Sequence, residues 1–182
     1  MNFLPIKPLK KKLVVAIGLT AVACLGVTAY AAITNVLGAG NIPYSETLDG
    51  PATVTVRTIS FAPGEVGAWH YHPGPLFNVV TQGTVTVEDG CGGEQSYTVG
   101  QAFEEGGRVH RPKNLGGVPT FAYQTFVVPL GSPTTLNIPN NQQMCGPVRD
   151  VEECKDEGWR NFNFPNAFNN QGECIASVRS QR

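Results

Sequence analysis

The sequence predicts an all-β protein of short strands, on three observations. Hydrophobic residues make up 41% of the 182 residues and charged residues only 15%, which argues against long surface helices and coiled coils. The 21 glycines and 14 prolines indicate many turns, while β-branched and aromatic residues are too plentiful for a disordered chain. Strand-like segments begin at intervals of about 8–12 residues, as they do in β-sandwiches and barrels.

The N-terminal 31 residues are typical of an export signal. Residues 10–12 are lysines, residues 13–30 are apolar and uncharged, and a small-x-small cleavage site ends at Ala31. The alternatives are an uncleaved membrane anchor, since the run from Leu13 to Ile33 is about long enough to span a bilayer, and lipidation at Cys24. The small residues favour cleavage. All three interpretations predict a secreted, periplasmic or cell-envelope protein that contacts a membrane only through this segment.

The remainder of the chain divides into three expected parts. Residues 32–50 lack a clear period and are predicted to form an N-terminal arm or edge strand. Residues 51–135 are predicted to form the barrel, with strands near 53–61, 68–72, 76–81, 84–88, 95–99, 107–111 and 120–128. Residues 136–182 are rich in Asn and Gln and are predicted to form a tail with at most a short helix near its acidic cluster at 150–157.

The distribution of charge and cysteine narrows the function. All 14 acidic residues but only nine of the 13 basic ones lie beyond position 12, so the body is acidic and nucleic acid is excluded as a partner. A small-molecule ligand or substrate is expected instead. Four cysteines remain after cleavage, an even number that in an exported chain predicts two disulfides, with three possible pairings among Cys91, Cys145, Cys154 and Cys174.

The tail carries a second cysteine-based pattern. Between Cys154 and Cys174 it follows C-x3-G-W-x2-F and F-x-N-Q-G-x-C, and so resembles a short C-terminal element of secreted bacterial proteins. On that resemblance, a Cys154–Cys174 disulfide would close a loop of about twenty residues and contribute about 3 kcal/mol. Trp159 would pack beneath it with Phe162, and Cys91 would then pair with Cys145.

Three histidines are the candidate functional residues. His70 and His72 alternate on a predicted strand, so both imidazoles point to one face. Imidazole is the commonest protein ligand of divalent transition metals, and His110 from a separate segment would complete a facial set with open positions. The alternative is three unrelated polar histidines, because a bare H-x-H often occurs by chance.

The flanking residues resemble the cupin superfamily. The first cupin motif, G-x5-H-x-H-x(3–4)-E-x6-G, is matched from Gly64 to Gly83 by GEVGAWHYHPGPLFNVVTQG, and the second, G-x5-P-x-G-x2-H-x3-N, from Gly100 to Asn114 by GQAFEEGGRVHRPKN, which is one residue short. The resemblance spans about residues 54–128. It implies a cupin-type β-barrel (a double-stranded β-helix or jelly roll), a divalent transition metal (Fe, Mn, Cu, Ni or Zn) on the three histidines, and a homodimer.

One position departs from the cupin pattern, because the usual glutamate ligand falls on Leu76. Three neutral imidazoles leave a bound divalent ion with its full charge, which favours an anionic substrate or a dioxygen-derived ligand. Asn78 shares a strand face with Leu76 and is expected to hydrogen-bond a metal-bound water, and Gln124 is a second pocket candidate. Glu104 and Glu105 are expected to face solvent or to be structural.

The sequence therefore predicts an exported cupin-domain metal-binding protein. Its resemblance to three-histidine cupins, such as the thiol and gentisate dioxygenases, implies a metal-dependent oxidoreductase of dioxygenase type that acts on a small organic substrate. The alternative is a non-catalytic cupin that binds a small ligand or a structural metal, because no acid–base residue is evident. No catalytic residue is assigned.

Overall fold

The computed structural model describes residues 32–180. The expected signal or anchor, residues 1–31, lies outside the described residues. Among the described residues, no helix combines the length and the apolar character needed to cross a membrane.

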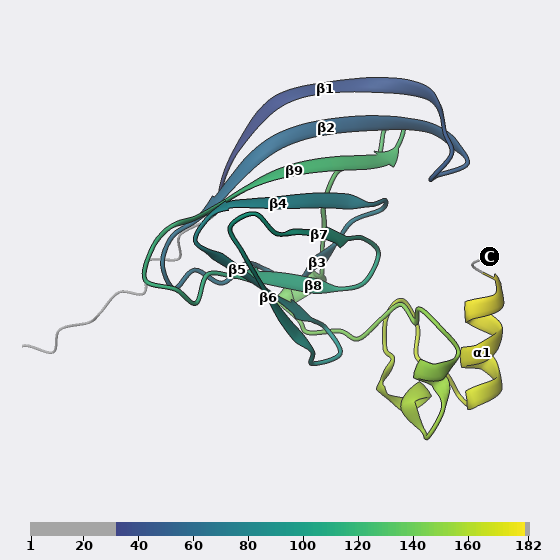
Figure 1. Ribbon diagram of the computed structural model, residues 1–182. Coiled ribbons are helices and arrows are strands. Elements are labelled where there is room, and N and C mark those ends of the chain that lie inside the picture. Colours follow the sequence, from purple (N-terminus) through teal and green to yellow (C-terminus); the bar gives the residue numbers. More distant parts are fainter. Residues whose placement is uncertain (1–31, 181–182) are drawn as a thin grey trace, which may run out of the picture.

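Two five-stranded antiparallel sheets face each other (Figure 1). The first contains, in spatial order, β1 (Ile33–Ser45), β2 (Gly50–Phe61), β9 (Thr120–Pro129), β4 (Leu76–Gln82) and β7 (Ala102–Glu105). The second contains β10 (Leu136–Asn137), β3 (His70–Tyr71), β8 (His110–Lys113), β5 (Thr84–Asp89) and β6 (Glu94–Thr98). The predicted all-β class is confirmed.

Alternation of side chains builds the barrel interior. In β9, the even-numbered residues from Thr120 to Val128 are buried, whereas their neighbours are exposed or half-buried. In β4, Leu76, Asn78 and Val80 are buried in the same manner. The turn after β4 uses Gly83 at a φ of +69°, a conformation that glycine adopts without a steric cost.

Some elements differ from the sequence-based expectation. The four-residue strand β7 was not predicted, because AFEE has no β-branched residue and two of its four residues are charged. The segment before Ser45, for which an arm or an edge strand was expected, forms β1, the edge strand of the first sheet, and pairs with β2 along most of its length.

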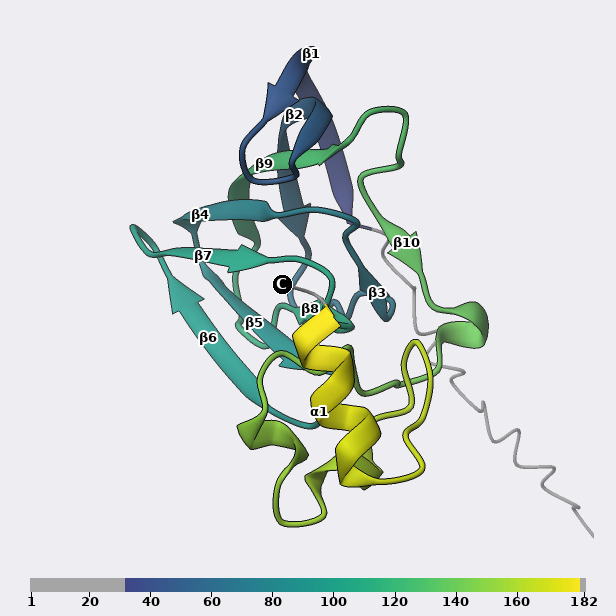
Figure 2. The same cartoon turned by 90° about the vertical axis from the view of Figure 1, so that its right-hand side faces the viewer.

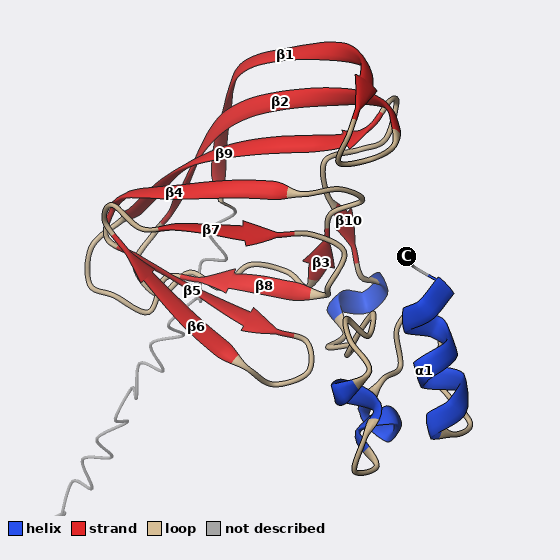
Figure 3. Cartoon of the chain, turned by 45° about the vertical axis from the view of Figure 1, so that its right-hand side comes forward, coloured by secondary structure: helices blue, strands red, loops and turns tan. Residues whose placement is uncertain are grey.

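The tail contains one α-helix, α1 (Gln171–Ser180), where no helix was predicted (Figure 2). Near residues 150–157 there are instead two 3-10 helices, η2 (Glu152–Cys154) and η3 (Gly158–Asn161), and a third, η1 (Pro139–Asn141), precedes them (Figure 3). Helix α1 has little amphipathic pattern, since it buries only Cys174 and Val178. Its start is stabilised by Asn170, whose Oδ1 accepts the Glu173 backbone N–H at 2.9 Å.

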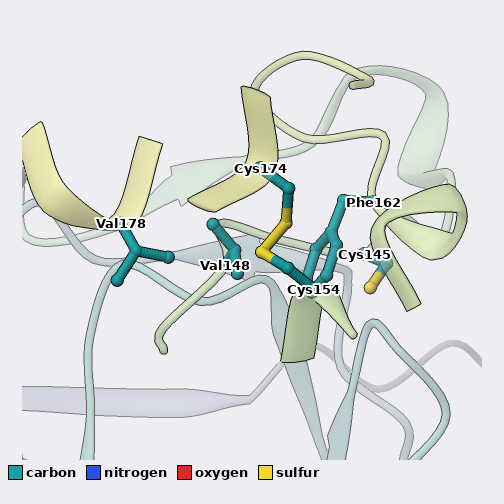
Figure 4. Close-up of a cluster of buried hydrophobic side chains, with 6 residues drawn as sticks. All are labelled: Cys145, Val148, Cys154, Phe162, Cys174 and Val178. Carbon is teal, nitrogen blue, oxygen red and sulfur yellow. A yellow bond between two sulfur atoms is a disulfide. The ribbon is translucent and has the colours of Figure 1, made fainter. Parts of the chain in front are cut away.

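Both disulfides expected from the tail resemblance are present, as Cys91–Cys145 and Cys154–Cys174. The second disulfide belongs to a small core of six buried side chains, with Phe162 beside it (Figure 4). Trp159 packs against the same core, as expected.

The tail also covers part of the barrel. Trp69 and Tyr71 point out of the barrel, as their alternation with the histidines predicts, yet Trp69 is only 3% exposed. Residues of the tail pack against this outer face, among them Ile138, Met144 and Phe164. The segment that carries His70 and His72 is therefore enclosed on both sides.

Candidate metal centre

The three histidines converge inside the barrel. His70 lies on β3 and pairs directly with His110, the first residue of β8, while His72 follows β3. Each residue offers one ligand atom, and these atoms lie within 4.8 Å of one another. The ring centroids are 4.5 to 5.1 Å apart. The structure thus brings together the three side chains that the two sequence motifs singled out.

Backbone carbonyl groups orient all three rings. Each Nδ1 lies 2.7 Å from a carbonyl oxygen, those of Ala68, Thr134 and Arg108 for His70, His72 and His110 respectively. A carbonyl oxygen only accepts, so each Nδ1 carries the hydrogen and each Nε2 carries a lone pair. The Nε2 atoms of His72 and His110 are buried and have no hydrogen-bond partner among the described residues. This arrangement is that of metal-binding histidines.

The electrostatic environment keeps the imidazoles neutral. Burial, followed by the neighbouring His110, lowers the pKa of His70 to about 4. Burial and then the other two rings lower the pKa of His72 to about 3, and burial lowers the pKa of His110 to about 4. At neutral pH all three rings therefore have the protonation state that metal coordination requires.

Glu105 reaches the histidines from β7. Its Oε1 lies 3.2 Å from the His110 Nε2, and its side chain is only 8% exposed. Burial raises the pKa of this carboxyl group, an effect that the nearby His70 opposes. Glu105 was expected to face solvent or to be structural; it does not face solvent, because β7 pairs with β4 in a register that sets Glu105 opposite Leu76. A carboxyl group thus lies beside the histidines although position 76 is apolar.

Leu76 itself is fully buried and packs with Phe126 and Val128. At position 76, where the first cupin motif usually has a glutamate ligand, this protein therefore has an apolar contact. Glu104 alternates with Glu105 and is exposed on the outer face, opposite Phe77.

Four polar side chains on neighbouring strands form one hydrogen-bonded chain, which we call the polar row. Arg57 Nε on β2 donates to Gln124 Oε1 on β9 at 2.7 Å, and Gln124 Nε2 donates to Asn78 Oδ1 on β4 at 2.9 Å. Asn78 Nδ2 then donates to Glu105 Oε2 on β7 at 2.9 Å. The two amides named from the sequence therefore line the interior, and their hydrogen bonds connect Arg57 to Glu105.

Sequence reasoning did not identify either end of the polar row as part of the site: it did not name Arg57, and it expected Glu105 to face solvent or to be structural. Arg57 had a detectable signal, because it occupies the same alternating positions of its strand as the buried Ile59 and Phe61. Glu105 had none, since β7 itself was not predicted.

A cavity of about 520 Å³ adjoins the site. Its polar lining includes His70, His72 and the polar row, and its apolar wall includes Ile59, Phe61, Phe103 and Ala122. A mainly apolar cavity of this size with a few convergent polar groups suits a small organic molecule.

One comparison with known proteins agrees with this architecture. A family model described as the cupin domain matches residues 57–126. A search of curated protein sequences finds no match.

Solved structures with a similar fold include an uncharacterised protein with a double-stranded β-helix domain from Klebsiella pneumoniae, at 20% identity and a TM-score of 0.45 over 60% of this chain and 85% of that one. A cupin domain from Bordetella pertussis is 21% identical with a TM-score of 0.43, over 56% of this chain and 98% of that one. The DMSP lyase DddQ from Ruegeria pomeroyi is 13% identical with a TM-score of 0.44, and the match covers 58% of this chain and 51% of that one. The family match covers residues 57–126, which include the three histidines, and the paired five-stranded sheets form the cupin-type barrel that the sequence motifs predicted.

Proposed function

We propose that this cupin is an exported metal-dependent oxidoreductase of dioxygenase type that acts on a small organic substrate, with His70, His72 and His110 as the metal ligands. The observation that carries the proposal is the pair of buried Nε2 lone pairs, on His72 and His110, that have no hydrogen-bond partner in the described part of the chain. Leaving a buried polar atom unsatisfied costs about 1–3 kcal/mol, and a metal ion shared by the three rings removes that cost.

The donor set fits a divalent transition metal such as Fe, Mn, Cu, Ni or Zn. His70 and His72 line the cavity, so a metal held by the three neutral imidazoles would be accessible to a ligand in the cavity. A metal bound there supplies Lewis acidity and, for the redox-active members of this group, the electron transfer that dioxygen chemistry needs.

The protein's own residues supply the remaining requirements. Glu105, at 3.2 Å from the His110 Nε2, places a carboxyl group where it compensates metal charge or takes up a proton from the substrate. Asn78 holds one oxygen of this carboxyl group, so the other oxygen faces the histidines. The apolar wall of the cavity limits the access of water to the substrate.

Export is supported by the two disulfides, because such bonds persist in oxidising compartments outside the cytoplasm. The secreted, periplasmic or cell-envelope location therefore belongs to the proposal. The homodimer and the cleavage after Ala31 stay predictions.

Metal analysis of the exported protein tests the proposal. After chelation, the protein is titrated with each of the five metals, and we expect one ion per chain. His72→Ala should reduce this stoichiometry to near zero. The control is Tyr71→Phe, a change at the adjacent residue, whose side chain points away from the histidines toward Phe164; it should bind metal as the wild type does.

Oxygen uptake with phenolic and thiol substrates then separates the two functions that the cupin fold admits. Uptake that depends on metal and on His72 supports the oxidoreductase. One metal per chain without turnover of either substrate class would instead support a non-catalytic cupin that binds a small ligand. Failure of every metal to bind the wild-type protein would refute the oxidoreductase and also a cupin that holds a structural metal.

A further inference from the structure

Arg57 is the only lysine or arginine among the described residues that line the cavity. It extends from β2 into the barrel and is half-buried. Its Nε donates to Gln124, and its guanidinium carbon lies 4.4 Å from the centroid of the Phe126 ring. One edge of the guanidinium group is thus bound to the sheet while one face is stacked on an aromatic ring.

The terminal nitrogens of Arg57 are not used by the fold. Within residues 32–180, Nη1 and Nη2 have no hydrogen-bond acceptor, and no carboxylate forms an ion pair with them. Arg108 shows the opposite case, because its guanidinium group pairs with Asp89 and Glu153 and also donates to the Pro147 carbonyl. A buried arginine that serves only the structure uses its donors as Arg108 does.

The polar row holds Arg57 in one orientation. Gln124 can accept from Arg57 only through Oε1, and this atom is directed at Arg57 because the amide nitrogen of Gln124 donates to Asn78. Asn78 in turn donates to Glu105, so every hydrogen bond of the polar row runs in the same direction, from Arg57 toward Glu105. A side chain held in this way loses little conformational entropy when it binds a ligand, which raises affinity.

We propose that Arg57 binds the carboxylate of the substrate, so that the cavity is specific for small organic anions with an apolar body. The terminal N–H groups of a guanidinium match the two oxygens of a carboxylate. With the carboxylate on Arg57, the apolar body would contact Ile59 and Phe61 and extend toward His70. The inference rests on the proposed function, because it names the substrate class of the same site.

Ligand binding to the metal-free protein tests this role separately from the metal. The probes are benzoate and 3-phenylpropionate, with benzamide and 3-phenylpropionamide as uncharged analogues of similar shape. Isothermal titration of the wild type should give at least about tenfold tighter binding for a carboxylate than for its amide. Arg57→Gln should remove this preference, because it should weaken the binding of the carboxylates at least about tenfold more than that of the amides.

A matched control is available in Arg111. Its Nε also donates to a side chain, that of Glu88, and its guanidinium carbon lies 4.5 Å from the Trp69 ring centroid, but it does not line the cavity. Arg111→Gln should therefore keep the preference for carboxylates. Arg57→Lys retains the charge without the two-pronged geometry and should show an intermediate preference, which keeps the test informative if Arg57→Gln fails to fold.

The outcomes separate this inference from the proposed function. Equal binding of acids and amides by the wild type, no binding of any acid, or an unchanged preference in both Arg57 variants would overturn the role of Arg57, whatever the metal analysis gives. Loss of the preference in Arg57→Gln, with Arg111→Gln unchanged, supports the role even if no metal binds.

Discussion

The disulfide between Cys91 and Cys145 is expected to stabilise both the fold and the metal centre. It joins the end of β5 to the tail beside the strand that carries His110. The backbone N–H of Val109 donates to the Gly146 carbonyl at 2.8 Å, and the Val109 carbonyl accepts from the Gly90 N–H at 2.8 Å. Replacing both cysteines with serine would release the chain on either side of Val109, next to the ligand.

The size of the effect follows from the two loops. The cysteines at 91 and 145 are separated by 54 residues, and constraining a loop of this length in the unfolded chain contributes about 4 kcal/mol to the free energy of unfolding. The cysteines at 154 and 174 are separated by 20 residues, for which the same relation gives about 3 kcal/mol. The loops do not overlap in sequence, so the two losses should add approximately.

Urea unfolding of the two double-serine variants, monitored by tryptophan fluorescence, measures these losses. We expect the 91/145 variant to be the less stable of the two. It should also bind metal about tenfold more weakly, because changes that disturb the support of a ligand typically have effects of this size. A 91/145 variant as stable as the wild type, or more stable than the 154/174 variant, would refute the loop argument. Unchanged metal affinity would refute the link between the tail and His110.

Three further predictions concern the interior. In the metal-free folded protein the three histidines have pKa values of about 3 to 4, whereas in the unfolded chain they protonate near pH 6.5. The unfolded state therefore binds more protons, and the free energy of unfolding should fall as the pH drops from about 6.5 toward 4. Urea titrations should show a shallower pH dependence of this free energy after all three histidines are changed to Gln, and an unchanged slope would contradict the prediction. Asn78→Leu should cost about 1–3 kcal/mol, because it leaves the Gln124 amide nitrogen and Glu105 Oε2 without partners, whereas Asn41→Leu in the exposed β1–β2 pair should cost less in the same urea assay. Metal at a hundred times its dissociation constant should raise the free energy of unfolding by about 2.7 kcal/mol, and a thermal shift that persists in the triple Gln variant would show that metal binds elsewhere.

Local features of the sequence were sufficient to predict the fold class and the three histidines of the site. Alternation places His70 and His72 on one face of a strand, and the glycines around them set the turns that the cupin motifs share. An even number of cysteines beyond the leader predicted two disulfides, and the tail pattern suggested the pairing that is observed. Each of these inferences uses residues that are close in sequence or a pattern that recurs in relatives.

The polar row could not be predicted in this way. Its members lie on β2, β9, β4 and β7, and they meet only because those strands pair in particular registers. A shift of one residue in the pairing of β7 would turn Glu105 to the outer face and Glu104 to the interior. The sequence near Glu105 contains no information about that pairing, which is set by the packing of the whole sheet.

By itself, the sequence determined a β-rich protein with three histidines positioned to meet and four cysteines to pair, because alternation and motif spacing are local properties. Only the tertiary structure decided that a carboxyl group enters from the strand opposite Leu76, that Arg57 faces the cavity with terminal nitrogens that have no partner among residues 32–180, and that the tail supports the strand of His110. The physical reason is that these contacts join strands distant in sequence, whose register depends on the summed packing and hydrogen bonding of the folded barrel.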